Sequence, residues 1–206
     1  MSLYSPDDAL QRVLRRYKDA PLAEERTHYR EALAGVVAAF LSRHEACLEA
    51  AAGAPFDVVT VVPSTGRTGR VDPAPHPLEA ALATVPTVAG RLRTLLARGS
   101  APVGHRAAAD GAFVPIAAST VDGTRVLLVD DTLTTGARLH SAASALSSAG
   151  ARSVVAAVVG RVVHPDRDPR HARFWTAVSS RCFDATSCVL CAHRAVEPCD
   201  ARGAIA

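Results

Sequence analysis

Apolar residues recur every three or four positions along the first quarter of the chain. This spacing holds from Pro6 to about Ala52 and places apolar side chains on one stripe of each of two successive helices. Gly53 and Pro55 then interrupt the pattern, because both residues disfavour the interior of a helix. We therefore predict a helical N-terminal part, residues 1–52.

Three short runs rich in β-branched residues predict buried strands. They cover residues 56–62, 125–129 and 153–159, and each has the continuous apolar character of a parallel strand that is covered on both faces. Between the last two, residues 137–149 carry a helical stripe that ends before Gly150. The order strand, helix, strand predicts a right-handed βαβ unit, and hence an α/β fold with a central, mostly parallel sheet flanked by helices.

Weaker patterns fill the stretch between the first two strands. Apolar spacing predicts short helices at residues 78–83 and 88–97. His76 precedes the first of them, and we expect it to be a surface residue at the helix start, with a position in the functional site as the alternative. Residues 98–111 are small and polar, which favours a loop.

Length and charge narrow the class of protein. A chain of 206 residues can bury the core of one domain but not of two, so we expect a core at residues 53–165 and a cysteine-rich hood or tail at 166–206. The 23 basic residues exceed the 20 acidic ones by only three, which gives little support to a nucleic-acid partner without excluding one. No apolar window has the length of a membrane span or a secretory signal, so we expect a cytoplasmic protein.

One segment combines a strand with candidate chemistry. After the apolar run 126–129 come two adjacent carboxylates, Asp130 and Asp131, and then a hydroxyl-rich turn with a glycine that opens a helix. Ligands of open α/β sheets bind at this edge, and the amides of a helix start bind phosphate. Carboxylates repel phosphate but accept hydrogen bonds from the vicinal hydroxyls of a ribose. The segment predicts a sugar-phosphate site, with a merely capped helix start as the alternative.

This arrangement resembles the 5-phosphoribosyl-1-pyrophosphate (PRPP) signature of type I phosphoribosyltransferases. The resemblance implies their fold, with a hood formed from N- and C-terminal segments. It also implies transfer of phosphoribose from PRPP, bound with Mg²⁺, to a small nitrogenous acceptor with release of pyrophosphate. Asp130 and Asp131 would bind the ribose hydroxyls. The 5-phosphate would be held by Thr132, Thr134, Thr135, Gly136 and Ala137. Thr134 stands where the purine-salvage branch has an acid, which argues against salvage of 6-oxopurines.

A wider resemblance is to the ComF-like, phosphoribosyltransferase-related proteins. It rests on four short matches: Arg16-Tyr17-Lys18, Val61-Val62-Pro63, Gly111-Ala112-Phe113 and Ala149-Gly150-Ala151. Those relatives carry their cysteine ligands near the N-terminus, whereas this chain has its cysteine cluster near the other end. A second function therefore stays open, that of a non-catalytic module binding PRPP or a nucleotide, such as a DNA-uptake factor or a regulator.

The first strand runs into a turn with phosphate-binding character. Residues 63–70 hold two glycines, three hydroxyls and two arginines, and backbone amides with guanidinium groups suit a pyrophosphate. The family resemblance makes this the pyrophosphate loop, with Arg67 also a catalytic candidate. Its core would be Ser64, Thr65, Gly66 and Arg67. The alternative is a solvated, glycine-rich connection.

Residues 97–111 resemble the flexible catalytic loop of the same enzymes. Its phosphate-seeking or acid-base candidates are Arg98, His105 and Arg106, and we expect Arg106 to close over the pyrophosphate as a catalytic residue. An ordinary exposed loop is the alternative.

Four of the five cysteines gather in the tail. Cys188 and Cys191 form a Cys-x-x-Cys pair, which suits one tetrahedral zinc ion. We predict a structural zinc site made by Cys182, Cys188, Cys191 and Cys199, with His193 as an alternative fourth ligand. Packed thiols and a redox dithiol are the competing interpretations, and Cys47 stands alone in the sequence. A homodimer through the long N-terminal helix is also open.

Overall fold

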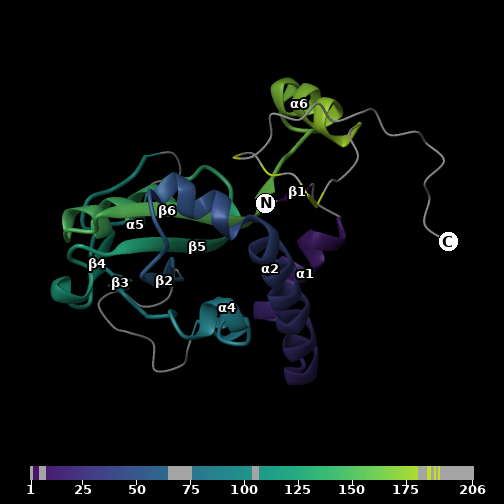
Figure 1. Cartoon of the computed structure of the whole chain (residues 1–206). Coiled ribbons are helices and arrows are strands. Elements are labelled where there is room, and N and C mark those ends of the chain that lie inside the picture. Colours follow the sequence, from purple (N-terminus) through teal and green to yellow (C-terminus); the bar gives the residue numbers. More distant parts are fainter. Residues whose placement is uncertain are drawn as a thin grey trace.

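The computed structural model describes residues 2–4, 8–64, 76–103, 107–180, 185, 186, 188 and 190. Its main sheet has four strands, and every pair of neighbours is parallel. The strand order is β1-β6-β5-β2, as Figure 1 shows for the three longer strands. The strands are β1 (Ser2–Tyr4), β2 (Val58–Val61), β5 (Arg125–Leu133) and β6 (Ser153–Val162). The predicted α/β class with a parallel sheet is confirmed.

The described residues form six α-helices besides this sheet. They are α1 (Ala9–Asp19), α2 (Ala23–Ala52), α3 (Pro77–Leu82), α4 (Pro86–Ala89), α5 (Ala137–Ser148) and α6 (Pro169–Ser179). The two helices predicted before Gly53 are confirmed, and Gly53 ends α2 in the left-handed conformation with φ of 85°. None of the helices in the described residues combines the length and apolar character that a membrane crossing requires.

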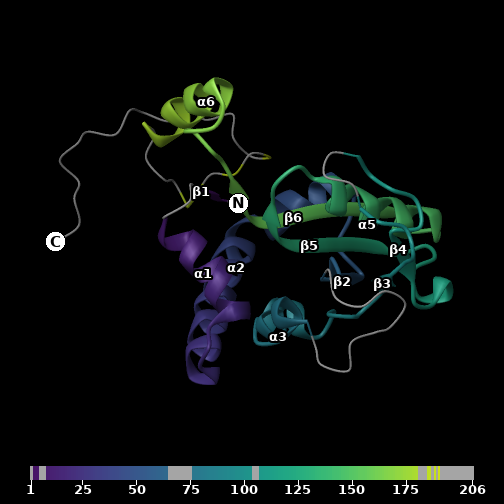
Figure 2. The same cartoon turned by 180° about the vertical axis from the view of Figure 1, so that it is seen from behind.

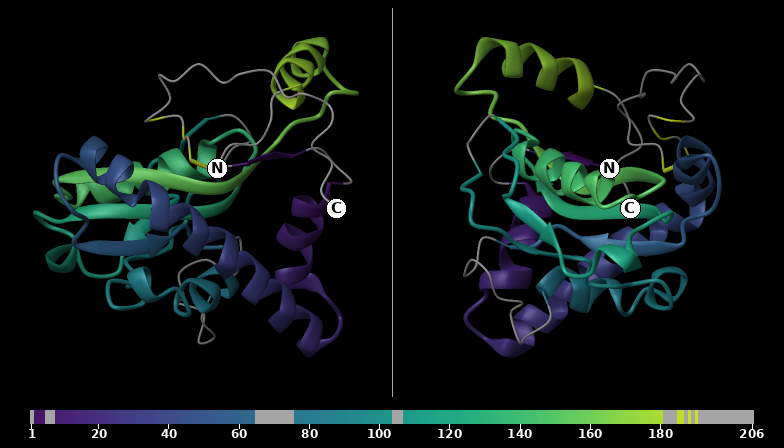
Figure 3. Two further views of the ribbon diagram at one scale, coloured as in Figure 1. Left: turned by 45° about the vertical axis from the view of Figure 1, so that its right-hand side comes forward. Right: turned by 90° about the vertical axis from the view of Figure 1, so that its left-hand side faces the viewer.

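The two faces of the sheet bury different helices because strand side chains alternate. Val59, Leu127 and Val129 face one core, which contains residues of α1, α2, α3 and α4. Val126 and Leu128 face the other core, which contains residues of α5 and of the segment that precedes β5. Helices α1 and α2 lie side by side, whereas α6 stands off beyond the end of β6 (Figures 2 and 3).

The predicted helix at residues 88–97 is wrong for most of its length. Helix α4 ends at Ala89, and the chain then extends into β3 (Leu96–Arg98), which pairs antiparallel with β4 (Phe113–Pro115). The apolar residues of this stretch pack on the sheet: Leu92 forms a bridge to Val59, and the Leu95 amide donates to Thr60 Oγ1 (3.3 Å). Arg98 therefore belongs to a strand and not to the expected loop.

Strand β1 and helix α6 are among the described elements that had no sequence prediction. Strand β1 pairs with the end of β6, where the Tyr4 ring lies so close to Gly160 that a Cβ there would meet it at 2.8 Å. Helix α6 begins at Pro169, after Asp168 has accepted a hydrogen bond from the Arg170 amide (2.7 Å). A three-residue strand is too short to show a period in the sequence.

Candidate functional site

Two of the predicted loops leave the same edge of the sheet. Strands β2 and β5 are parallel neighbours with Val61 opposite Val129, so Ser64 and Asp130 follow at the carboxyl ends of adjacent strands. Ser64 is exposed at this edge. The remaining predicted pyrophosphate residues, Thr65, Gly66 and Arg67, lie outside the described residues, as do His105 and Arg106 of the predicted catalytic loop.

Asp130 and Asp131 are both buried at the end of β5, but they face different sides of the sheet. By strand alternation, Asp130 continues the face of Leu128 and Asp131 the face of Val129. Asp131 therefore meets the end of α1. Its Oδ2 accepts a hydrogen bond from the Tyr17 hydroxyl (2.5 Å) and forms an ion pair with Lys18 Nζ.

The two carboxylates have different pKa values, one raised and one lowered. Burial, reinforced by the negative charge of Asp131, raises the pKa of Asp130 to about 7. Burial acts on Asp131 in the same direction, but the charge and hydrogen bond of Lys18 and the hydrogen bond of Tyr17 outweigh it and lower the pKa of Asp131. Burial and the charge of Asp131 raise the pKa of Tyr17, which keeps its hydroxyl a donor. Asp131 is thus negatively charged at neutral pH, whereas Asp130 gains or loses its proton near pH 7.

His76 joins this group from the start of α3. Its Nδ1 accepts a hydrogen bond from the Leu78 amide (3.2 Å), and its own amide donates to Glu79 Oε2 (3.3 Å), which together form a capping box. Burial and the nearby charge of Lys18 lower the pKa of His76 to about 4. The expected helix start is confirmed, and the ring is half-buried and neutral near the carboxylates rather than out on the surface.

The predicted phosphate turn lies at the start of α5, where Thr134 and Thr135 are exposed and Gly136 and Ala137 are buried. Gly136 takes the left-handed conformation with φ of 85° directly before Ala137, the first residue of the helix. A Cβ at Gly136 would also meet the His140 ring at 3.2 Å, so both the backbone conformation and the lack of space favour glycine at this position. The amides of this helix start can hold an anion. Thr132, at the preceding strand end, has its Oγ1 3.5 Å from the Tyr4 hydroxyl.

Two arginines add positive charge beside this turn. Arg138, in the first turn of α5, donates from Nη2 to the Pro63 carbonyl (2.7 Å) and so ties the phosphate turn to the end of β2. Its Nε is buried without a hydrogen-bond partner among the described residues, and the same holds for Nε and Nη1 of Arg98. Burial and the charge of Arg138 lower the pKa of Arg98, so the two cations repel each other. An anion bound near both would relieve that repulsion and satisfy their donors.

Tyr17, Lys18 and Arg138 belong to the site but were not among its predicted residues. Tyr17 and Lys18 were visible only as part of a family match, since they precede Asp131 by more than a hundred positions. Arg138 directly follows the predicted phosphate turn, and its position in the first turn of the helix was the one signal that could have identified it.

The tail cysteines are only partly described. Cys188 lies beside His44 and Cys47 of α2, whereas Cys182, Cys191, His193 and Cys199 lie outside the described residues. Cys47, which stands alone in the sequence, therefore has a cysteine neighbour in space.

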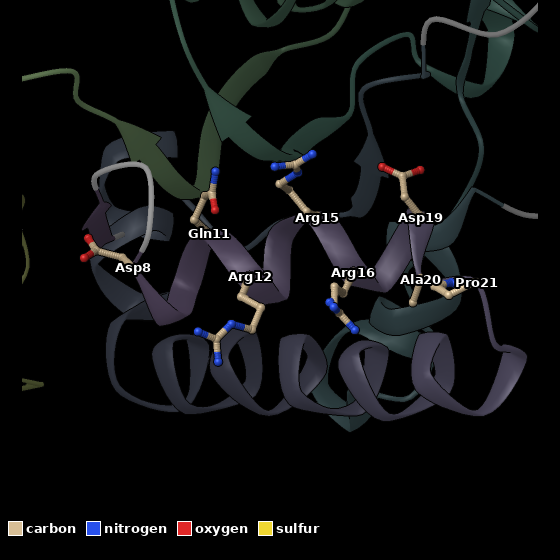
Figure 4. A pocket seen from close by; sticks show the side chains of 8 residues that line it. All are labelled: Asp8, Gln11, Arg12, Arg15, Arg16, Asp19, Ala20 and Pro21. Carbon is tan, nitrogen blue, oxygen red and sulfur yellow. The ribbon is translucent and has the colours of Figure 1, made fainter.

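A separate, open pocket runs along α1 (Figure 4). Arg12 and Arg16 point toward α2, whereas Gln11, Arg15 and Asp19 point away from it. Its lining contains none of the predicted site residues; it consists of Asp8, Gln11, Arg12, Arg15, Arg16, Asp19, Ala20 and Pro21.

A parallel sheet whose carboxyl edge carries two buried carboxylates, the start of α5 and the Arg138 side chain defines an α/β domain with a candidate site at that edge. Comparison with family models identifies the domain more closely. The phosphoribosyl transferase domain matches residues 83–185, half of the chain, so this protein belongs to that family and has the type I phosphoribosyltransferase fold.

One of the similar solved structures is described as the allosteric regulatory enzyme of purine biosynthesis. It is 18% identical to this chain with a TM-score of 0.37, and the match covers 64% of this chain and 26% of that one. The search of curated proteins found no match.

Proposed function

We propose that this protein binds PRPP and transfers its phosphoribosyl group to a small nitrogenous acceptor, with release of pyrophosphate. The observation that carries the proposal is the continuous segment from β5 to α5. It presents two buried carboxylates and then a helix start with two exposed threonines at one edge of the sheet. A ribose phosphate needs both halves, since its hydroxyls donate hydrogen bonds and its phosphate accepts them.

The 5-phosphate would lie at the start of α5. The amides at the start of α5 and the hydroxyls of Thr134 and Thr135 would supply donors, and the helix dipole favours the negative charge. The Ala137 amide, which donates to Thr135 Oγ1 (3.4 Å), would exchange that bond for one to the phosphate. Arg138 and Arg98 would add charge-assisted hydrogen bonds from guanidinium nitrogens that are otherwise buried without partners among the described residues.

The ribose would lie over Asp130 and Asp131. Tyr17 and Lys18 both use Oδ2 of Asp131, so its Oδ1 can accept from a ribose hydroxyl without disturbing either contact. The Lys18 ammonium has three hydrogens and can donate to an anionic ligand while it holds Asp131. Asp130, whose pKa is raised to about 7, would become the better acceptor once it is ionised.

Mg²⁺ fits this donor set, because carboxylate oxygens are the ligands it prefers and Asp130 and Asp131 stand at the same edge as the predicted pyrophosphate loop. When bound, the ion would neutralise charge on the departing pyrophosphate. The chain's own part is to grip that group through Ser64, Thr65, Gly66 and Arg67, and to exclude water as Arg106 closes over the site. No protein nucleophile is needed.

One contact supports the alternative of a non-catalytic PRPP-binding or nucleotide-binding module. Lys18 neutralises Asp131 from within the chain, and Lys18 and Tyr17 belong to the segment that resembles ComF-like proteins. A carboxylate already paired with a cation can still hold a ribose without contributing to turnover.

Titration calorimetry with PRPP and Mg²⁺ tests binding. We expect the Asp130→Asn plus Asp131→Asn variant to bind at least tenfold more weakly, because one charged hydrogen bond contributes about 1.5 to 3 kcal/mol. Asp57→Asn is the matched control, since this carboxylate accepts from the Arg125 amide (2.8 Å) at the opposite edge of the same strands. Equal affinity in all three proteins would remove the ribose assignment.

A screen for pyrophosphate release separates the two functions. PRPP is offered with purines, pyrimidines, orotate, ammonia or glutamine as the acceptor. Release that depends on one acceptor establishes the transferase, whereas PRPP binding without release from any of them favours the binding module. A wild-type protein that does not bind PRPP would contradict the transferase and the PRPP-binding module, and would leave only the nucleotide-binding form of the alternative.

A further inference from the structure

Three metal-binding side chains meet on α2, away from the carboxylate edge. His44 and Cys47 are three positions apart and so lie on the same side of the helix. Cys188 reaches them from the C-terminal segment, 141 positions after Cys47. One ring nitrogen of His44 and the two Sγ atoms all lie within 4.8 Å of one another.

A hydrogen bond to a group outside the cluster orients the His44 ring. Its ring is buried, lies 5.1 Å from the Phe40 ring and places Nε2 2.9 Å from the Ala185 carbonyl. A carbonyl only accepts, so Nε2 carries the hydrogen and Nδ1 has the lone pair that a metal requires. Metal-binding histidines commonly donate their other N–H to a backbone carbonyl in this way.

The ligand set selects the class of metal. Two thiolates and an imidazole are soft or borderline donors, which suit Zn²⁺ better than Mg²⁺ or Ca²⁺. Bonds of about 2.3 Å at tetrahedral angles need neighbouring ligand atoms about 3.7 Å apart. Because the ligand atoms lie within 4.8 Å of one another, their separations would have to shorten by at most about 1 Å, which rotation of the three side chains can provide.

The position of the cluster in the fold points to a structural role. The Ser153 hydroxyl donates to the Ala52 carbonyl (3.2 Å), so α2 ends beside the first residue of β6, at the sheet edge opposite Asp130. His44 and Cys47 lie within about 12 Å of that end at 1.5 Å per helical residue. A metal here would join the C-terminal segment to α2 without touching the phosphate-binding edge.

We propose that His44, Cys47 and Cys188 bind one Zn²⁺ ion that fastens the C-terminal segment to α2. This site differs from the one expected from cysteine spacing alone, because two of its three ligands come from the long N-terminal helix. It does not depend on the proposed PRPP chemistry.

Elemental analysis of the full-length protein after dialysis against a mild chelator is the first test. We expect about one zinc per chain in the wild type and an at least 100-fold weaker zinc affinity in Cys47→Ala and His44→Gln, because each change removes a ligand. His28→Gln is the matched control, an exposed histidine on the same helix, and should keep its zinc. Cys47→His replaces one ligand by another and should retain zinc, which separates ligand loss from misfolding.

Cobalt substitution checks the identity of the ligands. Co²⁺ bound in place of Zn²⁺ should show thiolate-to-metal absorption that weakens in Cys47→Ala and in Cys188→Ala. Zinc retained in both His44→Gln and Cys47→Ala would place the ligands in the C-terminal segment alone and overturn the proposal. A wild-type protein without zinc, or one with a disulfide between Cys47 and Cys188, would overturn it as well.

Discussion

The ion pair between Lys18 and Asp131 offers a direct test of how α1 is held at the carboxylate edge. Lys18→Met removes the ammonium and keeps an unbranched side chain of similar length. The side chains of Lys18 and Asp131 are 32% and 8% exposed, so the pair lies between a surface pair and a buried one. A surface pair contributes up to about 1 kcal/mol, whereas breaking a buried pair costs about 3 to 5 kcal/mol. Tyr17 still donates to Asp131 in the variant, so we expect a loss of about 2 kcal/mol at pH 7.

Urea unfolding at pH 7 in a double-mutant cycle measures this contribution. Lys18→Met should cost about 2 kcal/mol in the wild type but less than about 0.5 kcal/mol when Asp131 is already Asn. In thermal unfolding the same loss corresponds to a fall in Tm of about 4 to 8 °C for a chain of this size. Arg16→Met is the matched control, because its pair with Glu25 is 48% and 36% exposed and should contribute less than about 1 kcal/mol.

The stability lost in Lys18→Met depends on pH in a defined direction. Because the pKa of Asp131 is lowered in the folded state, the stability from this pair is present above the unfolded pKa of about 3.9. It is lost as the pH falls through the folded pKa. The difference between Lys18→Met and the wild type should therefore shrink below about pH 4. An equal cost of Lys18→Met with Asp131 and with Asn at that position would refute the coupling.

Three further predictions concern His76, Gly160 and Asp130. The pKa of His76 is lowered to about 4, so the neutral ring stabilises the fold fully above about pH 6.5, and this stabilisation is lost as the pH falls toward 4. His76→Asn removes the titrating ring and still caps α3. In urea unfolding, the variant should therefore lose about 2 kcal/mol less stability than the wild type between pH 7 and pH 5. Gly160→Ala should lower the free energy of unfolding by about 1 to 3 kcal/mol, since the added methyl would meet the Tyr4 ring at 2.8 Å. In a double-mutant cycle, Tyr4→Ala should remove most of that loss. Equal losses from Gly160→Ala with and without the Tyr4 ring would contradict the close contact. PRPP affinity measured by calorimetry should rise up to about tenfold from pH 6 to pH 8 as Asp130 ionises. Asp130→Asn should abolish this rise. A wild-type affinity that does not depend on pH would argue against Asp130 as a charged acceptor.

The sequence by itself determined the parts of this protein whose signals are local. Strand β5, the turn at Gly136 and helix α5 are contiguous, so their apolar run, their turn residue and their helical stripe predicted both the parallel sheet and the candidate phosphate turn. The two N-terminal helices were predictable for the same reason, because apolar residues repeat every three or four positions in each, as buried Leu14 and Tyr17 do in α1 and buried Leu33, Val37 and Leu41 do in α2. Short elements lack that repetition, which is why β1 was missed and β3 was mistaken for part of a helix.

Only the tertiary structure decided which distant side chains share a site. Adjacent residues of a strand face opposite sides, so Asp131 meets Tyr17 and Lys18 while Asp130 continues the other face. Cys47 and Cys188 likewise become neighbours because the C-terminal segment returns to α2. The pKa values of Asp130 and His76 follow from burial among such neighbours. Spacing along a chain records neither burial nor contacts between distant segments, so the charge state of the site and the composition of the metal cluster depended on how the chain folds.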